Sequence, residues 1–190
     1  MNWFYFSLLS IFALAAAELT QQHLLNSKTN IEERTSAVLT FLVQSIFTIP
    51  IIIFSDLRHS IFAVFDPSIF PFLLLGNFIG SIAMIYYLRS FKVKNISIST
   101  IFIAFSVVVS TTLGIIFFSE SLYLYKLLGI ALVLLAIVSL NISNFQLEKN
   151  HFYGLIAGTM FGITYSIDKY IITDSIQPII YIFCQLSTQV

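Results

Sequence analysis

Long apolar runs separated by short polar breaks dominate the chain, and the clearest pair occupies residues 98–141. Two apolar runs of similar length flank the polar break Ser119-Glu120-Ser121. An α-helix rises ~1.5 Å per residue, so about 20 apolar residues cross a hydrocarbon layer ~30 Å thick. Lipid offers no hydrogen-bond partner to an unpaired backbone group, which excludes isolated strands and loops. This stretch therefore predicts two membrane-spanning helices joined by a tight turn.

The same pattern along the whole chain predicts an all-α, polytopic transmembrane helical bundle. Asp66 and Pro67 precede the third span, where aspartate can cap a helix and proline suits its first turn. The last apolar segment corresponds to about 20 Å of helix and is too short to span the membrane. We expect spans at about residues 3–19, 37–54, 67–88, 96–118, 123–140 and 152–172, and a partial one at 178–190.

The first span has an alternative interpretation as a cleaved secretory signal, because Ala15, Ala16 and Ala17 precede Glu18. A signal carries a basic residue before its apolar run, and the first Lys or Arg in this chain is Lys28. The pattern therefore favours a spanning helix.

Composition supports a membrane protein whose main partner is the lipid bilayer. Hydrophobic residues make up 58% of the chain and charged residues only 9%, against about 25% charged in soluble domains. The net charge of zero gives no indication of a nucleic-acid partner. The single cysteine, Cys184, excludes an intrachain disulfide, and His23, His59 and His151 are too scattered for a metal site. We therefore expect no metal and no cofactor.

Glycines recur at helical spacing in two of the predicted spans. Gly76 and Gly80 form a G-x-x-x-G pair, and Gly154, Gly158 and Gly162 recur at every fourth position. Small residues at this spacing let neighbouring helix backbones approach closely. The sequence predicts tight helix packing at both places.

Ionisable residues inside the predicted spans are the first functional candidates, because each costs about 2.5–3.5 kcal/mol to insert. Glu18 follows three alanines, and desolvation disfavours the charged form of a carboxylate, so we expect Glu18 to bind and release a proton. The alternative is that Glu18 meets water where the first helix ends. Asp168 and Lys169 point about 100° apart on a helix; they line a cavity, or Lys169 snorkels to the membrane surface.

Polar residues complete the set of candidates. Ser106, Ser110, Thr111 and Thr112 give the fourth span a polar stripe suited to hydrogen bonding between helices or to lining a cavity. We expect Glu120 to cap the start of the next helix, where a carboxylate is favoured by ~0.3–1 kcal/mol. The substrate or proton candidates are Glu18, Gln21, Ser110, Tyr165, Asp168 and Lys169.

Two segments suggest an internal repeat. Residues 12–26 and 162–176 share a pattern in which an apolar helix acquires an acid near one end, so that Glu18 aligns with Asp168. Five predicted helices, counting the first, precede the point at which the pattern restarts.

Residues 117–141 (FFSESLYLYKLLGIALVLLAIVSLN) resemble the end of a repeat in the EamA-type transporters of the drug/metabolite transporter superfamily. Tyr86-Tyr87-Leu88-Arg89 and residues 97–100 resemble the passage from the third to the fourth helix of that family. One departure is that Ser106-Val107 stand where many members carry a proline. The motif positions of the family are occupied by Ser119, Glu120, Leu122, Lys126, Leu128 and Gly129.

The resemblance implies ten helices in two inverted five-helix repeats that transport small metabolites or drugs by alternating access. On this basis residues 1–148 are the first repeat and residues 149–190 an incomplete second one. It also implies an integral membrane protein of the bacterial inner membrane and no enzyme activity. The proton binding expected of Glu18 adds the hypothesis that transport is coupled to protons. Two alternatives are a truncated, non-transporting fragment and a small subunit that acts only as a homodimer.

Another class of function is a membrane-integral enzyme on lipid-linked substrates, which would need an acidic or histidine cluster at one membrane face. The sequence contains no D-x-x-D or H-x-x-x-H spacing of that kind.

The membrane orientation has two opposed indications. The Lys and Arg bias between loops places the N-terminus outside, whereas the family places it inside, and we keep the family's orientation.

Overall fold

The computed structural model describes residues 2–26, 31–53, 65–93, 96–142, 148–174 and 181. These residues form helices and their connecting turns without a β-strand, which confirms the all-α prediction. The seven helices are α1 (Asn2–Leu25), α2 (Glu33–Ile53), α3 (Phe70–Ser90), α4 (Ile96–Ile103), α5 (Phe105–Phe118), α6 (Leu124–Ile142) and α7 (His151–Asp174).

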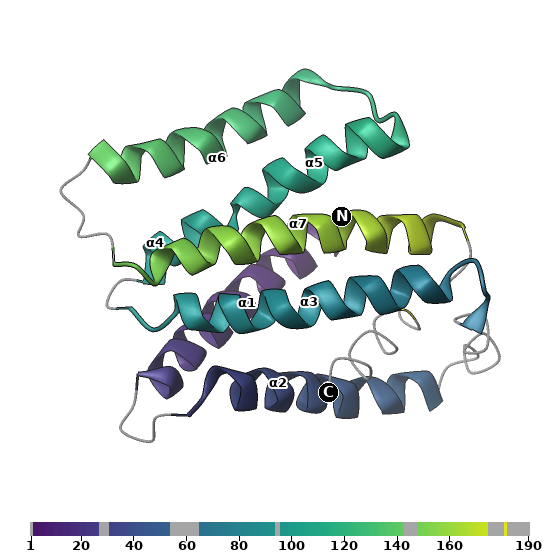
Figure 1. Cartoon of the computed structure of the whole chain (residues 1–190), viewed down its shortest axis with the longest axis horizontal. Coiled ribbons are helices and arrows are strands. Elements are labelled where there is room, and N and C mark those ends of the chain that lie inside the picture. Colours follow the sequence, from purple (N-terminus) through teal and green to yellow (C-terminus); the bar gives the residue numbers. More distant parts are fainter. Residues whose placement is uncertain are drawn as a thin grey trace.

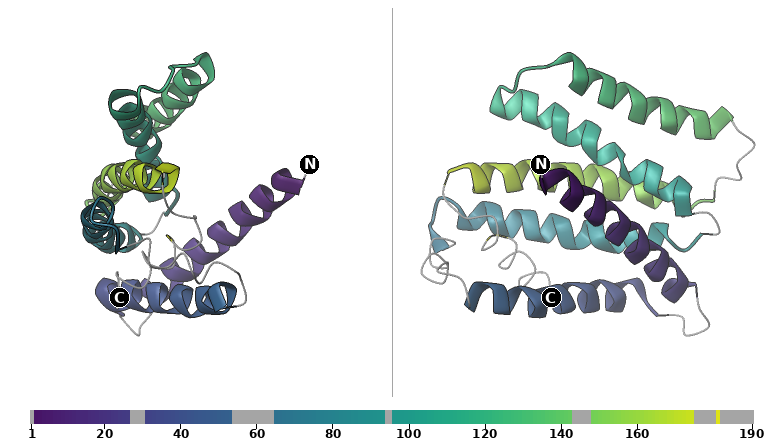
Figure 2. Two further views of the ribbon diagram at one scale, coloured as in Figure 1. Left: turned by 90° about the vertical axis from the view of Figure 1, so that its right-hand side faces the viewer. Right: turned by 180° about the vertical axis from the view of Figure 1, so that it is seen from behind.

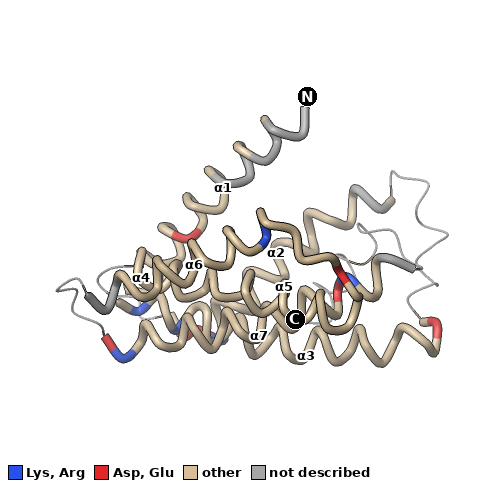
Figure 3. Tube along the Cα trace, turned by 90° about the horizontal axis from the view of Figure 1, so that it is seen from above, with Lys and Arg blue, Asp and Glu red and all other residues tan. Residues whose placement is uncertain are grey.

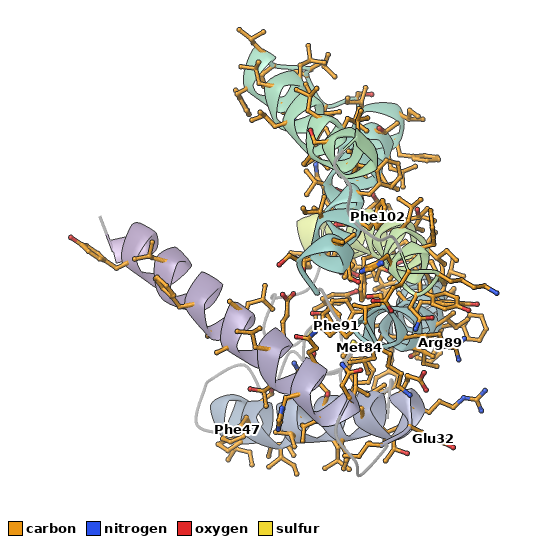
Figure 4. All side chains as sticks on the ribbon, turned by 90° about the vertical axis from the view of Figure 1, so that its left-hand side faces the viewer. Glu32, Phe47, Met84, Arg89, Phe91 and Phe102 are labelled. Atoms are coloured by element: carbon orange, nitrogen blue, oxygen red, sulfur yellow. The ribbon has the colours of Figure 1, made fainter. Side chains whose placement is uncertain are left out.

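Five helices lie side by side in the order α6, α5, α7, α3, α2, and α1 crosses this layer obliquely (Figure 1). The C-terminal end of α1 contacts the layer, where Leu25 packs with Phe41, Met84 and Phe91 in one buried cluster. The N-terminal half of α1 stands away from the other helices (Figures 2 and 4). Phe12 on that half is 67% exposed.

Two segments of the described residues have the length and hydropathy of a membrane span, namely Phe70–Ser90 and Ser97–Phe118. Leu124–Ser139 is a shorter apolar helix. Long stretches of the helices carry no charged side chain (Figure 3). The predicted partial span at residues 178–190 lies outside the described residues, apart from Tyr181.

The first two helices are longer than the hydropathy pattern predicts. α1 continues to Leu25 instead of ending near residue 19, and α2 begins at Glu33 instead of residue 37. The polar end of α1 is stabilised by tertiary contacts: the Gln22 side chain donates to Val93 O at 3.1 Å, and the Asn26 side chain donates to Phe91 O at 3.0 Å. Glu18 therefore lies well inside α1, and its expected alternative position at a helix end is wrong.

The glycines of α7 bring its backbone against α4 and α5, which confirms the predicted tight packing. A Cβ atom placed on Gly154 would lie 2.9 Å from Ser99 O, and one on Gly158 would lie 2.7 Å from Ile103 O. On Gly162 it would lie 2.8 Å from Ser106 O. Any larger residue would therefore collide with backbone atoms of the neighbouring helix.

α3 packs on the other side of α7, and both of its glycines are buried. A Cβ atom on Gly76 would lie 3.3 Å from Ile167 Cγ2 of α7, and Gly80 lies one turn further along α3. α7 is consequently the central helix of the layer, held between α3 and the α4–α5 segment.

The span predicted at residues 96–118 is present, but it is not one continuous helix. Ala104 separates α4 from α5, and Val107 N–H donates to Ala104 O at 3.1 Å, a three-residue step where an α-helix uses four. The interruption occurs without a proline, at the point where Ile103 O and Phe102 O face Gly158. We attribute the interruption at Ala104 to the close approach of α7, which a local sequence pattern does not record.

Two turns were predicted from the sequence. The turn before α6 matches the prediction, and the turn before α3 differs from it. Ser119 adopts the left-handed conformation (φ 51°) after α5, which confirms the tight turn before α6. Asp66, expected to cap α3, instead caps a turn before it by accepting hydrogen bonds from Ser68 N and Ser68 Oγ. These bonds hold the pKa of the Asp66 carboxyl below its usual value, and α3 itself begins at Phe70 without a side-chain cap.

Candidate functional site

A cavity of about 250 Å³ lies between α5 and α7, beside the turn that leads into α6. It brings together three of the six candidate residues, Ser110, Tyr165 and Lys169, with Glu120 from the turn. The remaining lining residues are Thr111, Gly114, Phe118 and Ser166. Polar groups from two apolar helices thus converge on one partly open cavity.

Glu120 is the charged centre of this cavity. Its Oε1 atom pairs with Lys169 Nζ from α7, and its Oε2 atom pairs with Lys126 Nζ from the first turn of α6. Gly114 makes room for the carboxylate, because a Cβ atom there would lie 3.2 Å from Glu120 Cδ. We expected Glu120 to cap the start of α6; instead its carboxylate joins α7 to α6.

Aromatic rings lie beside both ammonium groups. Lys169 Nζ is 5.0 Å from the ring centroid of Phe118, and Lys126 Nζ is 6.0 Å from that of Tyr123. A cation over a ring face gains about 0.5–1 kcal/mol or more when water is excluded. Lys169, whose side chain is 41% exposed, thus contacts Glu120 and Phe118 and lines the cavity.

Asp168 uses partners other than those of its neighbour Lys169. The Tyr181 hydroxyl donates to Asp168 Oδ1, and this oxygen lies 4.0 Å from the position of a Cβ atom on Gly76 of α3. Asp168 therefore faces α3 while Lys169 faces α5 and α6, as expected for adjacent residues on a helix.

Glu18 does not line this cavity. Its Oε1 atom accepts a hydrogen bond of 3.0 Å from the Tyr87 hydroxyl of α3. A second cavity of about 400 Å³ adjoins it, lined by Ala15, Glu18, Leu19, Ser97, Thr100 and Ile101. Gln21, the remaining candidate, is half-buried and lies one turn further along α1.

Aromatic contacts connect the two sites. The Tyr87 ring lies edge-on to Phe161 with centroids 5.9 Å apart, and Phe161 stacks on Tyr165 at 6.1 Å. Tyr165 lines the first cavity and Tyr87 contacts Glu18. Sequence reasoning missed Phe161 entirely; its only signal was the four-residue spacing to Tyr165, which places both on one face of α7.

The model of the EamA-like transporter family matches residues 1–142, a stretch that includes α1 to α6. The chain belongs to the EamA-like transporter family. Members of this family are integral membrane proteins that transport small molecules, and they are not enzymes. Comparisons with curated proteins and with solved structures gave no match.

One end of this EamA-family layer is fixed by side-chain amides. The segment after α3 presents three backbone carbonyls, and each accepts from a different side chain: Phe91 O from Asn26, Lys92 O from Asn150 and Val93 O from Gln22. Gln22 belongs to α1, Asn26 directly follows α1, and Asn150 directly precedes α7. The carbonyls of the segment that follows α3 are thereby satisfied without continuing the helix.

The basic residues at the same end of the EamA-family chain are paired with an acid. Lys92 Nζ lies 3.3 Å and Arg89 Nε lies 3.6 Å from Glu33 Oε1, at the start of α2. Burial raises the pKa of Glu33, but its hydrogen bonds and the two cations outweigh this, so the pKa lies below its usual value. Arg89 and Lys92 thus join the C-terminal end of α3 to the start of α2.

Proposed function

We propose that this chain transports a small molecule by alternating access, with the cavity between α5 and α7 contacting the substrate and Glu18 exchanging a proton. The observation that carries the proposal is the group of charged side chains, Glu120, Lys126 and Lys169, beside a cavity between apolar helices. Ionisable residues in apolar helices are costly, so their convergence beside one cavity supports a role in binding.

The proton role of Glu18 is supported by its surroundings. Glu18 lies inside an apolar helix, half-buried, next to a cavity and to the Tyr87 hydroxyl. A carboxylate accepts the tyrosine hydrogen bond, while a protonated carboxyl can rotate to donate one. Both states of Glu18 thus have a partner, as a proton carrier requires.

The internal repeat is part of the same proposal. Glu18 of α1 and Asp168 of α7 each accept a hydrogen bond from a tyrosine hydroxyl, Tyr87 and Tyr181 respectively. This similarity supports α7 as the first helix of a second repeat, equivalent to α1. We propose residues 1–148 and 149–190 as the two repeat units, in the bacterial inner membrane.

The test is uptake into liposomes that contain the full chain and a trapped pH-sensitive dye. A panel of amino acids, carboxylates and amines is added outside, with an imposed pH gradient. We expect one class of compound to move protons with it, and Glu18→Gln to remove the pH dependence of its uptake. Glu32→Gln, which changes an exposed acid just before α2, serves as the matched control.

Two results would contradict the proposal. If no compound of the panel enters faster than into empty liposomes, the transport function is wrong. If uptake occurs with the same pH dependence in Glu18→Gln as in the unchanged protein, transport stands and the proton role of Glu18 is removed.

A further inference from the structure

Arg89 lies where the span Phe70–Ser90 ends. Residues 67–88 carry no charged side chain, and the span itself has 21 residues. A helix of this length rises about 30 Å, which is the thickness of the hydrocarbon layer. The Arg89 side chain therefore lies near the level of the lipid headgroups, on the side of α3 away from α1 (Figure 4).

Two aromatic rings flank the Arg89 guanidinium. Its Cζ atom is 5.9 Å from the ring centroid of Tyr86 and 5.3 Å from that of Tyr153, and the two rings stack with their centroids 5.7 Å apart. The planar guanidinium of arginine is suited to such contacts with aromatic faces. Since Tyr86 belongs to α3 and Tyr153 to α7, the packing of these two helices positions Arg89.

The charge around Arg89 is positive. The Glu33 Oε1 atom lies 3.6 Å from Arg89 Nε and 3.3 Å from Lys92 Nζ, so one carboxylate faces two cations. The other described charges at this end of the layer balance one another, two basic and two acidic: Arg34, Lys149, Glu32 and Glu148. Among the described residues, this end of the layer thus carries one more positive than negative charge.

The Arg89 side chain retains donors for a ligand. A guanidinium has five N–H donors, and the contact with Glu33 is made through Nε alone, which leaves the two terminal nitrogens to other acceptors. Paired N–H donors of this kind match two oxygens of one phosphate group. The side chain is 37% exposed, so a headgroup can reach it.

The helix surface on the membrane side of Arg89 is apolar. Leu75 and Phe78 precede Arg89 by 14 and 11 residues, close to whole numbers of helical turns, so they share its face of α3. Leu75 is 49% and Phe78 is 67% exposed, and Ile156, about one turn after Tyr153 on α7, is 43% exposed. Acyl chains fit this surface, and a phosphate that reaches Arg89 is therefore that of a lipid.

We propose that Arg89, held between Tyr86 and Tyr153, binds the headgroup phosphate of an anionic phospholipid. The excess positive charge selects a lipid of net negative charge over a zwitterionic one, because basic pockets between membrane helices bind anionic headgroups. The bound lipid contacts α3 and α7 together and stabilises the packing of the central helix. Arg89 does not line the α5–α7 cavity, so this site is independent of the proposed transport function.

The test is thermal unfolding of the purified full chain in neutral detergent, with increasing phosphatidylglycerol or phosphatidylcholine of the same acyl chains. Each variant is compared with itself without lipid, so that the lipid-dependent shift in Tm reports binding separately from the stability of the fold. We expect saturable stabilisation by phosphatidylglycerol, at a concentration about fivefold lower than phosphatidylcholine requires.

Arg89→Gln should raise the half-saturating concentration of phosphatidylglycerol about tenfold, because it removes charge-assisted hydrogen bonds to the phosphate. Tyr153→Leu keeps the charge but removes one flanking ring, and should weaken binding less. Arg34→Gln removes an exposed arginine at the same end of the layer and is the matched control, which should bind like the unchanged protein. If Arg89→Gln does not fold, Arg89→Lys replaces it and should also weaken binding, since lysine lacks the paired donors.

Equal affinity for phosphatidylglycerol and phosphatidylcholine overturns the proposal, as does unchanged phosphatidylglycerol binding in the folded Arg89 variant. Equal weakening in Arg34→Gln also overturns it, because the attraction would then be spread over the basic end of the layer instead of located at one site. Soluble glycerol 3-phosphate is the last comparison. If it stabilises the protein at the same concentration as phosphatidylglycerol and this effect is lost in Arg89→Gln, the occupant is a dissolved phosphate and the lipid assignment is wrong.

Discussion

Gly158→Ala should separate α7 from the α4–α5 segment and destabilise the protein. The new Cβ atom would lie 2.7 Å from Ile103 O and 3.0 Å from Phe102 O, both backbone atoms that cannot rotate away. Ordinary contact begins at 3.4 Å, so the helices must move apart by about 0.7 Å at this point. Overpacking of this kind costs about 1–3 kcal/mol.

The matched control is Gly129→Ala in α6, because a Cβ atom there would meet no atom within 4 Å. Both substitutions are in helix interiors and gain the same ~1 kcal/mol of helix propensity. The difference between their free energies of unfolding therefore measures the packing term alone. Gly76→Ala should fall between them, because its nearest contact is a side-chain methyl group, Ile167 Cγ2, at 3.3 Å.

The assay is reversible unfolding in mixed micelles with increasing sodium dodecyl sulfate, followed by circular dichroism of the helices. We expect Gly158→Ala to be less stable than Gly129→Ala by about 1–3 kcal/mol. Equal stability of the two variants would refute the reasoning, since it would mean that α7 does not approach the backbone of α4 as closely as described.

Two further predictions concern the end of the layer that is fixed by amides. Asn26→Asp removes the N–H donor to Phe91 O and should lower the unfolding free energy by about 1–3 kcal/mol, whereas Thr35→Ser, an exposed change in α2, should leave it unchanged in the same assay. The lowered pKa of Glu33 means that its stabilising effect is complete above the ordinary value of 4.5 and is lost as the pH falls through the folded-state value. Unfolding measured from neutral to acid pH should show this loss, and Glu33→Gln should reduce it; an identical acid profile in the variant would contradict the pairing with Lys92.

The position and type of the helices could be predicted from the sequence because both depend on local apolar runs. The glycine spacing on α7 likewise indicated close packing before its partner was known, and Gly154, Gly158 and Gly162 do contact a neighbouring backbone. Contacts between residues that are distant in the sequence could not be predicted. The polar end of α1 is helical because Gln22 and Asn26 reach carbonyls at Val93 and Phe91.

The same distinction holds for the candidate site. Ser110, Tyr165 and Lys169 could each be singled out, since a polar residue in an apolar helix is costly. Their convergence on one cavity depends on the packing of α7 against α5, which no local pattern records. The pairing of Glu120 with Lys169 was missed because the two residues are far apart in the chain.

The interruption at Ala104 offers a way to detect a displacement of α7 during a conformational change. No proline or glycine stands at that position and Ile103 O faces Gly158 there, so we expect the hydrogen bond from Val107 N–H to Ala104 O to depend on the contact with α7. If α7 withdraws, the same amide becomes able to bond to Ile103 O as in a regular helix. The nuclear magnetic resonance shift of the Val107 amide in ¹⁵N-enriched protein would then report the position of the central helix, without a probe group attached to a side chain.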